Sequence, residues 1–412
     1  MSIKVLIIHN RIHLGGPIYV VAYLTKYLDN RFETKLIVGP PLDDEISAEY
    51  LLDEMEITHT LIPEMQRSFN PFMDIISFIK IRKIIREFKP DIVHTHTTKP
   101  GVLGRLAAYL CKVPIIIHTY HGHIFHSYFS GFTSAAIRSI ECLLAKISTA
   151  IIAISDVQKQ EIVDIYKITG FEKAKVIPLG IDLDKFAFNK AEKRVIFRKK
   201  YNLQENDVAF AHIGRFAPVK NHMLLFEALE IIKTKRPEIY QNIVIFLIGD
   251  GELKRVFQQK LEHCNIAYSE KNRDFEGGGV IFTSWIKEID QVVPGFDAVV
   301  LTSHNEGTPS SLIESQAAGV PVISSAVGGV INIVADGTTG LLIPTGDKVS
   351  LANAMIRFAT NPDERKNMGN AAQEWTQSKF SYKRLISDTT DLYLSLYNKK
   401  NKINTQPNPQ KK

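Results

Sequence analysis

Apolar runs alternate with amphipathic helical patterns along this chain. In the first half, runs rich in Val and Ile carry no polar alternation, which is typical of parallel strands buried on both faces. These runs predict strands at Val5–Ile8, Thr34–Val38, Ile92–His94, Ile115–Thr119 and Ala150–Ile154. Helical patterns lie between them, near residues 17–29, 72–88, 101–110, 134–147 and 156–167. The alternation predicts a doubly wound α/β sheet.

The second half repeats this rhythm, so two such domains are expected. The length of 412 residues also favours two cores over one. The predicted strands here are Val208–Ile213, Ile243–Ile248, Val280–Phe282, Ala298–Leu301 and Val320–Ser324. We expect a first domain at 1–182, a second at 183–377, a final helix at 378–398 and a disordered polar tail at 399–412.

Composition narrows the class of protein. The 45% hydrophobic and 23% charged residues are those of an ordinary globular protein. A net charge of +6 is too small to argue for nucleic-acid binding, but it suits anionic substrates or an anionic membrane surface. Three widely spaced cysteines indicate free thiols in a reducing compartment. The N-terminus lacks a signal-peptide layout and no run is long enough to span a membrane, so a cytoplasmic location is expected.

The segment from Phe72 to Phe88 has two interpretations. Its apolar residues can share one helical face, with Lys80, Arg82, Lys83 and Arg86 largely off that face. We expect this face to pack on the sheet. The alternative is a basic amphipathic helix lying on anionic lipid.

The most informative segment runs from Ser303 to Glu314. An apolar strand leads into Glu306-Gly307-Thr308-Pro309, and a helix is expected to begin at Pro309. Free amides at a helix start favour a phosphate, and nearby carboxylates accept hydrogen bonds from sugar hydroxyls. Glu306 and Glu314 therefore suggest a sugar-phosphate or sugar-nucleotide site, although either alone could be a solvated surface residue.

A second motif, Gly214 to His222, follows the first strand of the second half. Arg215 brings a fork that grips phosphate oxygens, and Lys220 brings a compact charge nearby. Gly328-Gly329 could form part of a phosphate loop wall, whereas Asp336 to Gly340 is expected to be a simple turn. Ser284 and Trp285 follow a strand, where backbone and ring could hold a base.

Histidines and glycines mark the strand ends of the first half. Gly15-Gly16 allow close backbone approach before a helix, but no third glycine completes a dinucleotide fingerprint. His118, His121 and His123 lack further ligands at metal-like spacing, so His121 is better suited to bond a sugar or a departing phosphate. His94 and His96 either line the same cleft or are satisfied polar residues at a strand end.

Together these motifs resemble those of the retaining glycosyltransferases of family 4, which have the GT-B fold: two Rossmann-like domains that face a central cleft. The resemblance spans nearly the whole chain. Its most specific parts are Gly214-Arg215-Phe216 with Lys220, similar to the family's phosphate-binding pair, and Glu306 to Glu314, similar to its Glu-x₇-Glu motif. His121 lies where the family has its active-site histidine, and Gly15-Gly16 match the glycine loop.

The resemblance implies a role for each matched residue. Arg215 and Lys220 would bind the diphosphate, Glu306 the sugar hydroxyls and Glu314 the ribose. No metal or other cofactor is expected, and the helix at 378–398 would cross back to the first domain. The implied catalytic residues are His121, Arg215, Lys220 and Glu306; the donor contacts are Gly15, Gly16, Gly214, Ser284, Trp285, Gly307, Thr308, Pro309, Ser310, Leu312 and Glu314; the acceptor contacts are His96, Phe125, His126 and Tyr128.

The expected function is transfer of a sugar from a nucleotide sugar to a glycan or a lipid-diphosphate-linked saccharide. UDP-sugars are favoured and GDP-sugars stay open, in cell-surface polysaccharide biosynthesis at the cytoplasmic face of the inner membrane. One alternative is a catalytically silent, nucleotide-sugar-binding subunit of an assembly complex. Another is a nicotinamide-dependent oxidoreductase, which the incomplete glycine fingerprint disfavours. No nucleic-acid partner is expected, and the oligomeric state stays open.

Overall fold

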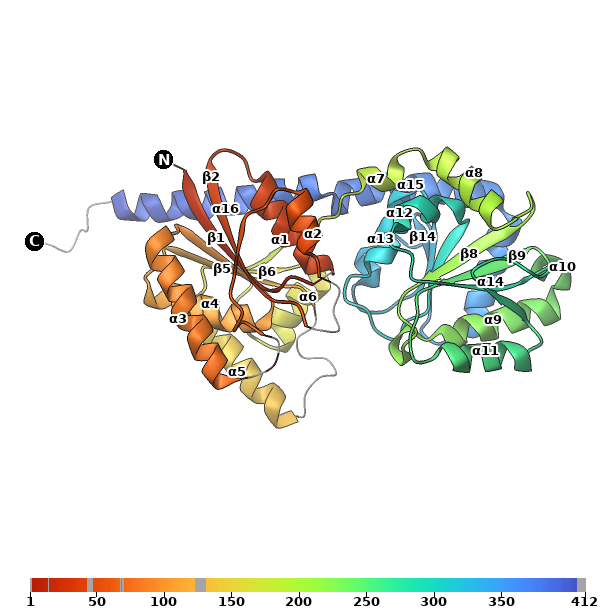
Figure 1. Ribbon diagram of the computed structural model, residues 1–412, viewed down its shortest axis with the longest axis horizontal. Coiled ribbons are helices and arrows are strands. Elements are labelled where there is room, and N and C mark those ends of the chain that lie inside the picture. Colours follow the sequence, from red (N-terminus) through yellow and green to blue (C-terminus); the bar gives the residue numbers. More distant parts are fainter. Residues whose placement is uncertain are drawn as a thin grey trace, which may run out of the picture. The chain divides into compact units, whose positions relative to one another are not determined.

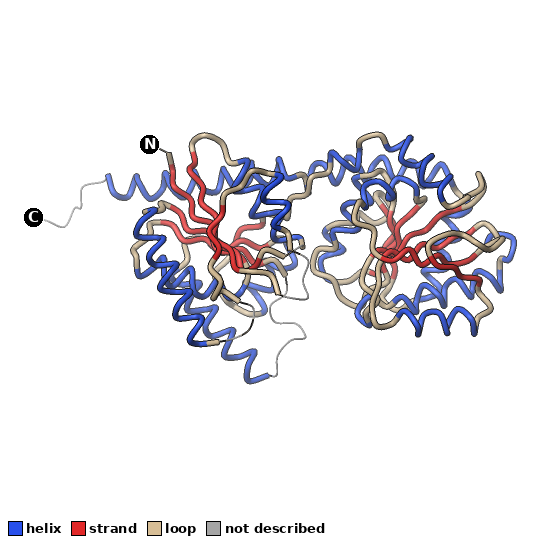
Figure 2. The backbone as a smooth tube through the Cα atoms, viewed as in Figure 1, coloured by secondary structure: helices blue, strands red, loops and turns tan. Residues whose placement is uncertain are grey.

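Two α/β units make up the chain in the computed structural model, which describes residues 2–13, 15–42, 47–66, 68, 70–122 and 131–405 and leaves out the side chains of 131–136 and 403–405. One unit is Met1–Ile181 with Tyr382–Lys412, and the other is Asp182–Ser381. Within the described ranges, each unit is built around a parallel sheet of seven strands (Figures 1 and 2). The predicted pair of doubly wound α/β domains is confirmed.

Unit 1 has the sheet order β3-β2-β1-β4-β5-β6-β7. Its strands are β1 (Ile3–Arg11), β2 (Phe32–Gly39), β3 (His59–Leu61), β4 (Ile92–His96), β5 (Ile115–Tyr120), β6 (Ala150–Ala153) and β7 (Ala174–Val176). Its helices are α1 (Gly16–Tyr27), α2 (Glu49–Glu54), α3 (Pro71–Phe88), α4 (Thr98–Leu110), α5 (Gly131–Ile147), α6 (Asp156–Gln160), a π-helix (Glu161–Ile165) and α16 (Tyr382–Thr405).

Successive side chains of a strand point to opposite faces, and this gives unit 1 two apolar layers. Val5 and Ile7 of β1 pack with α1, α2 and α16 on one face. Leu6 and Ile8 of the same strand pack with α3 and α4 on the other. The central strand is therefore apolar throughout its middle, which is why it carries no alternation in the sequence.

Unit 2 has the sheet order β10-β11-β9-β8-β12-β13-β14. Its strands are β8 (Val208–Ile213), β9 (Ile243–Ile248), β10 (Ala267–Glu270), β11 (Gly279–Ser284), β12 (Ala298–Leu301), β13 (Val322–Ser325) and β14 (Gly340–Ile343). Its α-helices are α7 (Asp184–Ala187), α8 (Lys190–Lys200), α9 (His222–Lys235), α10 (Pro237–Tyr240), α11 (Lys254–His263), α12 (Ile289–Val292), α13 (Ser310–Ala317), α14 (Lys348–Thr360) and α15 (Pro362–Phe380). Short 3-10 helices are η2 (Pro218–Lys220), η3 (Val293–Gly295) and η4 (Gly328–Asn332).

The final helix belongs to unit 1, as the fold prediction states, but its bounds differ from those expected. It begins at Tyr382 and not at 378, because Ser381 is extended with φ −62° and ψ 138° and ends α15. The Tyr382 amide donates to Ile181 O at 3.0 Å, and Gly180 leaves room for Leu385, which would lie 2.7 Å from a Cβ at that position. The helix continues to Thr405, so residues 399–405 are not part of a tail.

The expected apolar face of α3 is divided between two environments. Ile81 and Ile85 are buried against the sheet, as predicted. Phe72, Ile75 and Ile79, at the start of the helix, are instead 69%, 59% and 59% exposed. The apolar stripe is therefore buried against the sheet mainly in the second half of the helix. Within the described residues, no helix has the length and apolar character needed to cross a bilayer.

Candidate functional site

Lys220 and Glu306 form an ion pair where two neighbouring strands of unit 2 end. Lys220 closes η2, which follows β8, and Glu306 lies in the loop after β12. The Lys220 Nζ to Glu306 Oε1 distance is 2.7 Å, and Ser303 Oγ donates to the same oxygen at 2.6 Å. Both hydrogen bonds go to Oε1, and no described residue bonds Oε2, so the second carboxylate oxygen is available to a ligand.

The segment around η2 is tied to the β12 end at further points. Thr302 Oγ1 donates to Lys220 O at 3.0 Å, and the His304 amide donates to Val219 O at 2.9 Å. Beneath them, the buried rings of His212 and His222 lie with centroids 3.9 Å apart. Burial, with Lys220 close by, lowers the pKa of His222 to about 3, so the His222 ring stays uncharged beside the Lys220 ammonium.

Gly328 and Gly329 press backbone against the Glu306 loop. A Cβ at Gly328 would lie 2.0 Å from Glu306 O, and one at Gly329 would lie 1.7 Å from Gly307 O. The Gly329 amide also donates to Glu306 O at 3.0 Å. Any side chain here would displace the loop that presents Glu306, a role more specific than the loop wall expected from sequence.

Helix α13 begins at Ser310, one residue later than predicted. Pro309 is its N-cap, with φ −69° and ψ 107°, and this extended ψ keeps it outside the helix. The first amides of a helix have no intrahelical acceptor and favour an anion. Leu312 is fully buried and fixes the helix, while Gly307 and Thr308 are half-buried in the loop before it.

Glu314 lies within α13 and is half-buried. Burial raises the pKa of Glu314 to about 7, with Lys185 opposing that rise and Asp290 adding to it. A carboxyl group so poised near neutral pH is common at functional sites.

Arg215 is exposed in the loop after β8, and no described residue pairs with its guanidinium. Gly214, before it, packs against a neighbouring loop, because a Cβ on Gly249 would lie 2.0 Å from Gly214 O. The loop is thus held by backbone contacts while the Arg215 side chain stays available.

Ser284 ends β11 in a left-handed conformation, with φ 61°. Its hydroxyl donates to Asp250 Oδ2 at 3.2 Å, and the Gly249 amide donates to Ser284 O at 3.2 Å. Strained non-glycine residues of this type concentrate at binding sites. The next residue, Trp285, is 59% exposed at the same strand end.

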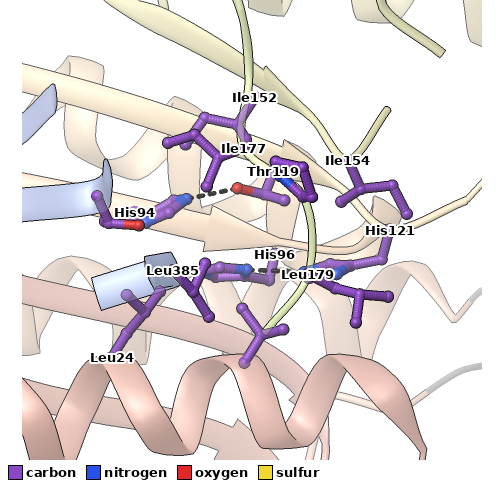
Figure 3. A pocket seen from close by; sticks show the side chains of 13 residues that line it. Leu24, His94, His96, Thr119, His121, Ile152, Ile154, Ile177, Leu179 and Leu385 are labelled. Carbon is purple, nitrogen blue, oxygen red and sulfur yellow. Dashed lines mark hydrogen bonds between the residues drawn. The ribbon is translucent and has the colours of Figure 1, made fainter. Parts of the chain in front are cut away.

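In unit 1, histidines gather at the ends of β4 and β5 (Figure 3). His96 Nδ1 lies 2.8 Å from His121 Nε2. His94 bonds Tyr393 of α16 through Nδ1 at 2.6 Å and Thr119 through Nε2 at 2.7 Å. A cavity of about 10 Å³ adjoins this row, and its lining is mostly apolar.

Burial keeps these rings neutral. It lowers the pKa of His94 to about 3 and that of His121 to about 4, and it lowers the pKa of His96 well below the usual value. His118 lies apart from this row: its Nδ1 is 2.9 Å from Thr95 Oγ1. Among the described residues, no group of three histidine, cysteine or acidic side chains is arranged to hold a metal ion.

The residues of unit 1 that were expected to contact the donor or the acceptor differ in their surroundings. Gly16 begins α1, and a Cβ there would meet nothing within 4 Å, so its surroundings are open. Phe125, His126 and Tyr128 lie outside the described residues. His96 is fully buried and bonded to His121, which leaves it no surface for an acceptor. Tyr393 was missed because nothing local links it to His94, 299 residues away.

Two family models cover most of the chain. The model described as Glycosyltransferase Family 4 matches residues 14–185, and the model described as Glycosyl transferases group 1 matches residues 193–375.

Named relatives share about a quarter of their residues with this chain. An Escherichia coli protein named UDP-Gal:alpha-D-GlcNAc-diphosphoundecaprenol alpha-1,3-galactosyltransferase is 29% identical over 81% of this chain and 83% of its own length. A Staphylococcus aureus capsular polysaccharide biosynthesis glycosyltransferase, CapM, is 26% identical over 82% and 85%.

Solved structures show the same fold. Anabaena HepE in complex with UDP has a TM-score of 0.77 at 20% identity, over 95% of this chain and 100% of that one. A glycosyltransferase from Rickettsia africae also has a TM-score of 0.77 at 20% identity, over 96% and 98%.

Proposed function

Because the chain belongs to the family 4 glycosyltransferases with the GT-B fold, we propose that it is a retaining transferase of nucleotide sugars in cell-surface polysaccharide biosynthesis. The donor proposed first is a UDP-sugar, with GDP-sugars second. The acceptor proposed is a lipid-diphosphate-linked saccharide. The E. coli relative supports both choices, since its name contains a UDP-sugar donor and a diphosphoundecaprenol-linked acceptor.

One observation carries the proposal: the Lys220–Glu306 pair at the carboxyl ends of adjacent strands, beside the start of α13. Ligands of open α/β sheets bind at such strand ends. Lys220 has further N–H donors for phosphate oxygens while it keeps its bond to Glu306 Oε1. Oε2 of Glu306, which no described residue bonds, then accepts from a sugar hydroxyl.

Other residues of unit 2 are proposed to bind the remaining parts of the nucleotide sugar. Arg215 binds diphosphate oxygens with Lys220, and the Thr308 and Ser310 backbone lies at the anion-favouring helix start. Glu314 accepts from the ribose hydroxyls. Ser284 and Trp285 hold the base by backbone bonding and ring contact.

The proposed reaction keeps the donor's anomeric configuration. The bond from the anomeric carbon to the diphosphate breaks, and the acceptor oxygen bonds to that carbon on the same face. The acceptor proton passes to the departing phosphate oxygen. Arg215 and Lys220 neutralise the charge that grows on the diphosphate, and one such donor is typically worth about 10²–10³ in rate. His121 donates a hydrogen bond to the donor sugar or to that phosphate.

We also propose that α3, α4 and α5 of unit 1 rest on an anionic bilayer. These helices are neighbours on one face of the sheet (Figure 1). Lys83, Arg86, Lys112 and Lys146 are exposed on and beside them, which favours anionic headgroups. The exposed large apolar side chains there are Phe72, Ile75, Ile79, Leu106, Tyr109, Leu110, Ile140 and Leu143.

Vesicle sedimentation tests this surface. Ile75→Glu with Ile79→Glu should abolish binding to vesicles that contain phosphatidylglycerol. Val195→Glu with Ile196→Glu is the matched control, because these side chains of α8 are similarly exposed, at 66% and 60%. Equal binding by both double variants would remove α3 from the contact.

A thermal-shift screen over nucleotide sugars tests the donor proposal. A ligand that binds the native state raises the unfolding midpoint, so the best donor identifies base and sugar together. We expect the largest rise with a UDP-sugar. If neither UDP- nor GDP-sugars raise the midpoint or bind by calorimetry, the proposal fails. Binding without turnover on any acceptor would instead favour a silent binding subunit.

A further inference from the structure

His96 contacts the proposed active-site histidine from inside the protein. Its Nδ1 lies 2.8 Å from His121 Nε2, and the two rings stack with centroids 5.1 Å apart and planes 28° apart. His96 is fully buried at the end of β4, while His121 is half-buried just after β5. Figure 3 shows the two rings joined along the line of their nitrogens.

The far side of His96 is also fixed. The ring of His94 lies against it, with centroids 4.1 Å apart. His94 is itself bonded at both nitrogens, to the Tyr393 hydroxyl and to Thr119 Oγ1. His96 is thus held between one ring anchored to α16 and the ring of His121.

The hydrogen bond between two neutral imidazoles needs one N–H and one lone pair. Burial lowers the pKa of both His96 and His121, so neither ring carries a second proton at neutral pH. The remaining question is which of the two nitrogens holds the shared proton.

The other nitrogen of His96 answers it. His96 Nε2 is buried and has no hydrogen-bond partner among the described residues. A buried N–H without an acceptor is rarer and costlier than a buried lone pair without a donor. His96 therefore carries its proton on Nδ1 and donates it to His121 Nε2, which obliges His121 to carry its own proton on Nδ1.

We infer that His96 is the positioning residue of His121, which it fixes as the Nδ1–H tautomer and so as a neutral hydrogen-bond donor. A ring pinned in this way cannot take a proton at Nε2, so it stabilises negative charge by donating a bond and does not act as a base. The catalytic meaning rests on the proposed function, but the tautomer itself does not.

Nitrogen NMR of the rings tests the tautomer without any activity assay. Long-range ¹H–¹⁵N correlations on histidine-labelled protein distinguish a protonated from a bare ring nitrogen, and His121→Gln identifies the His121 signals. We expect a protonated Nδ1 and a bare Nε2 in His121. A protonated Nε2 in the native chain overturns the inference.

A matched pair of variants tests the positioning. His96→Asn keeps a side-chain N–H near the place of Nδ1, and His96→Leu has the same branching without a donor. We expect His96→Leu to mix the His121 tautomers and to lower kcat roughly tenfold with little change in KM, a loss typical of one hydrogen bond. His96→Asn should restore most of both.

The control is His118→Asn, which truncates a neighbouring buried ring that bonds Thr95 and not His121. It should leave the His121 spectrum as in the native chain. An unchanged His121 tautomer in His96→Leu would overturn the positioning role. If only the proposed function is wrong, turnover will be absent while the His121 NMR spectra still show the predicted tautomer.

Discussion

At the scale of single residues, Lys220 is the side chain whose loss should cost most. It is paired with Glu306 at 2.7 Å, and both side chains are largely buried. We predict that Lys220→Ala lowers kcat by about 10²–10³ while the fold is kept, because one preorganised donor at a growing charge is worth that much. Steady-state turnover with the best donor measures it.

Lys348→Ala is the control for that variant. Lys348 pairs with Glu227 at 3.4 Å but is 52% exposed, so its ion pair contributes little. Near-native kcat in both variants would remove Lys220 from the catalytic role.

Glu314 predicts a pH dependence of donor affinity. Burial raises the pKa of its carboxyl to about 7, so the acid is partly protonated at neutral pH. Ribose hydroxyls favour the carboxylate, hence binding should release a proton and tighten as the pH rises through that value. We expect roughly tenfold tighter binding at pH 8 than at pH 6, about one pKa unit of differential interaction. Calorimetry measures it, and Glu314→Gln should flatten the curve; a slope retained in this variant assigns the titration elsewhere.

The site pairs could be predicted from sequence only in part. The motifs were predicted to follow strands, and the structure places them in the last residues of a strand or in the loop after it. Lys220 and Glu306 are, however, 86 residues apart. They meet because β8 and β12 are neighbours in the sheet. The order of strands in a sheet cannot be predicted from a local sequence pattern. His96 and His121 meet for the same reason at β4 and β5.

At the scale of elements, a buried hydroxyl is among the contacts that hold α16 against the sheet of unit 1. Tyr393 is fully exposed to the apolar layer, with no solvent contact, and its hydroxyl bonds His94 at 2.6 Å. Tyr393→Phe keeps the ring but leaves a buried nitrogen of His94 unpaired. We predict a loss of about 1–3 kcal/mol in the free energy of unfolding, measured by denaturant titration.

Tyr397→Phe on the same helix is the matched control, since Tyr397 is only partly buried at the edge of that layer. It should stay within about 0.5 kcal/mol of the native chain. Equal losses in the two variants would show that the bond to His94 contributes nothing.

The element prediction succeeded for long apolar runs and failed at sheet edges. The central strands of both units were found because burial on both faces makes them continuously apolar. The edge strands β3, β7, β10 and β14 were missed. β3, β7 and β10 are three or four residues long and contain polar positions, so they leave no apolar run. One of them, β14, begins at Gly340, within the predicted turn. α3 was found, but its outward-facing apolar end depends on how the helix lies against the sheet.

At the scale of the whole molecule, buried histidines predict that acid destabilises unit 1 first. Burial lowers the pKa of His9, His94, His96, His118 and His121 there, and of His212 and His222 in unit 2. Below about pH 6.5 the histidines of the unfolded chain bind protons, whereas the buried native rings stay neutral. Each such ring lowers the free energy of unfolding by up to about 1.4 kcal/mol per pH unit as the pH falls. This stability is present above that pH and is lost as the pH falls towards the lowered native values.

The two tryptophans distinguish the units in a denaturant titration followed by both fluorescence and circular dichroism. Trp285 and Trp375 both lie in unit 2, so fluorescence follows unit 2 while circular dichroism follows both. Between pH 7.5 and 5.5, we expect the dichroism transition to begin at lower denaturant while the fluorescence midpoint moves less. A fluorescence midpoint that falls as far as the first dichroism change would contradict this distribution of titrating groups.

The anomeric configuration of the product tests whether the chain transfers sugar from a nucleotide sugar with retention. The chain is incubated with the donor chosen by thermal shift and a lipid-diphosphate-linked saccharide, and the new linkage is read by NMR. We predict that an α-linked UDP-sugar gives an α-linked product with release of UDP, and that Lys220→Ala gives almost none. A β-linked product, or no nucleotide released from any UDP- or GDP-sugar, would contradict it.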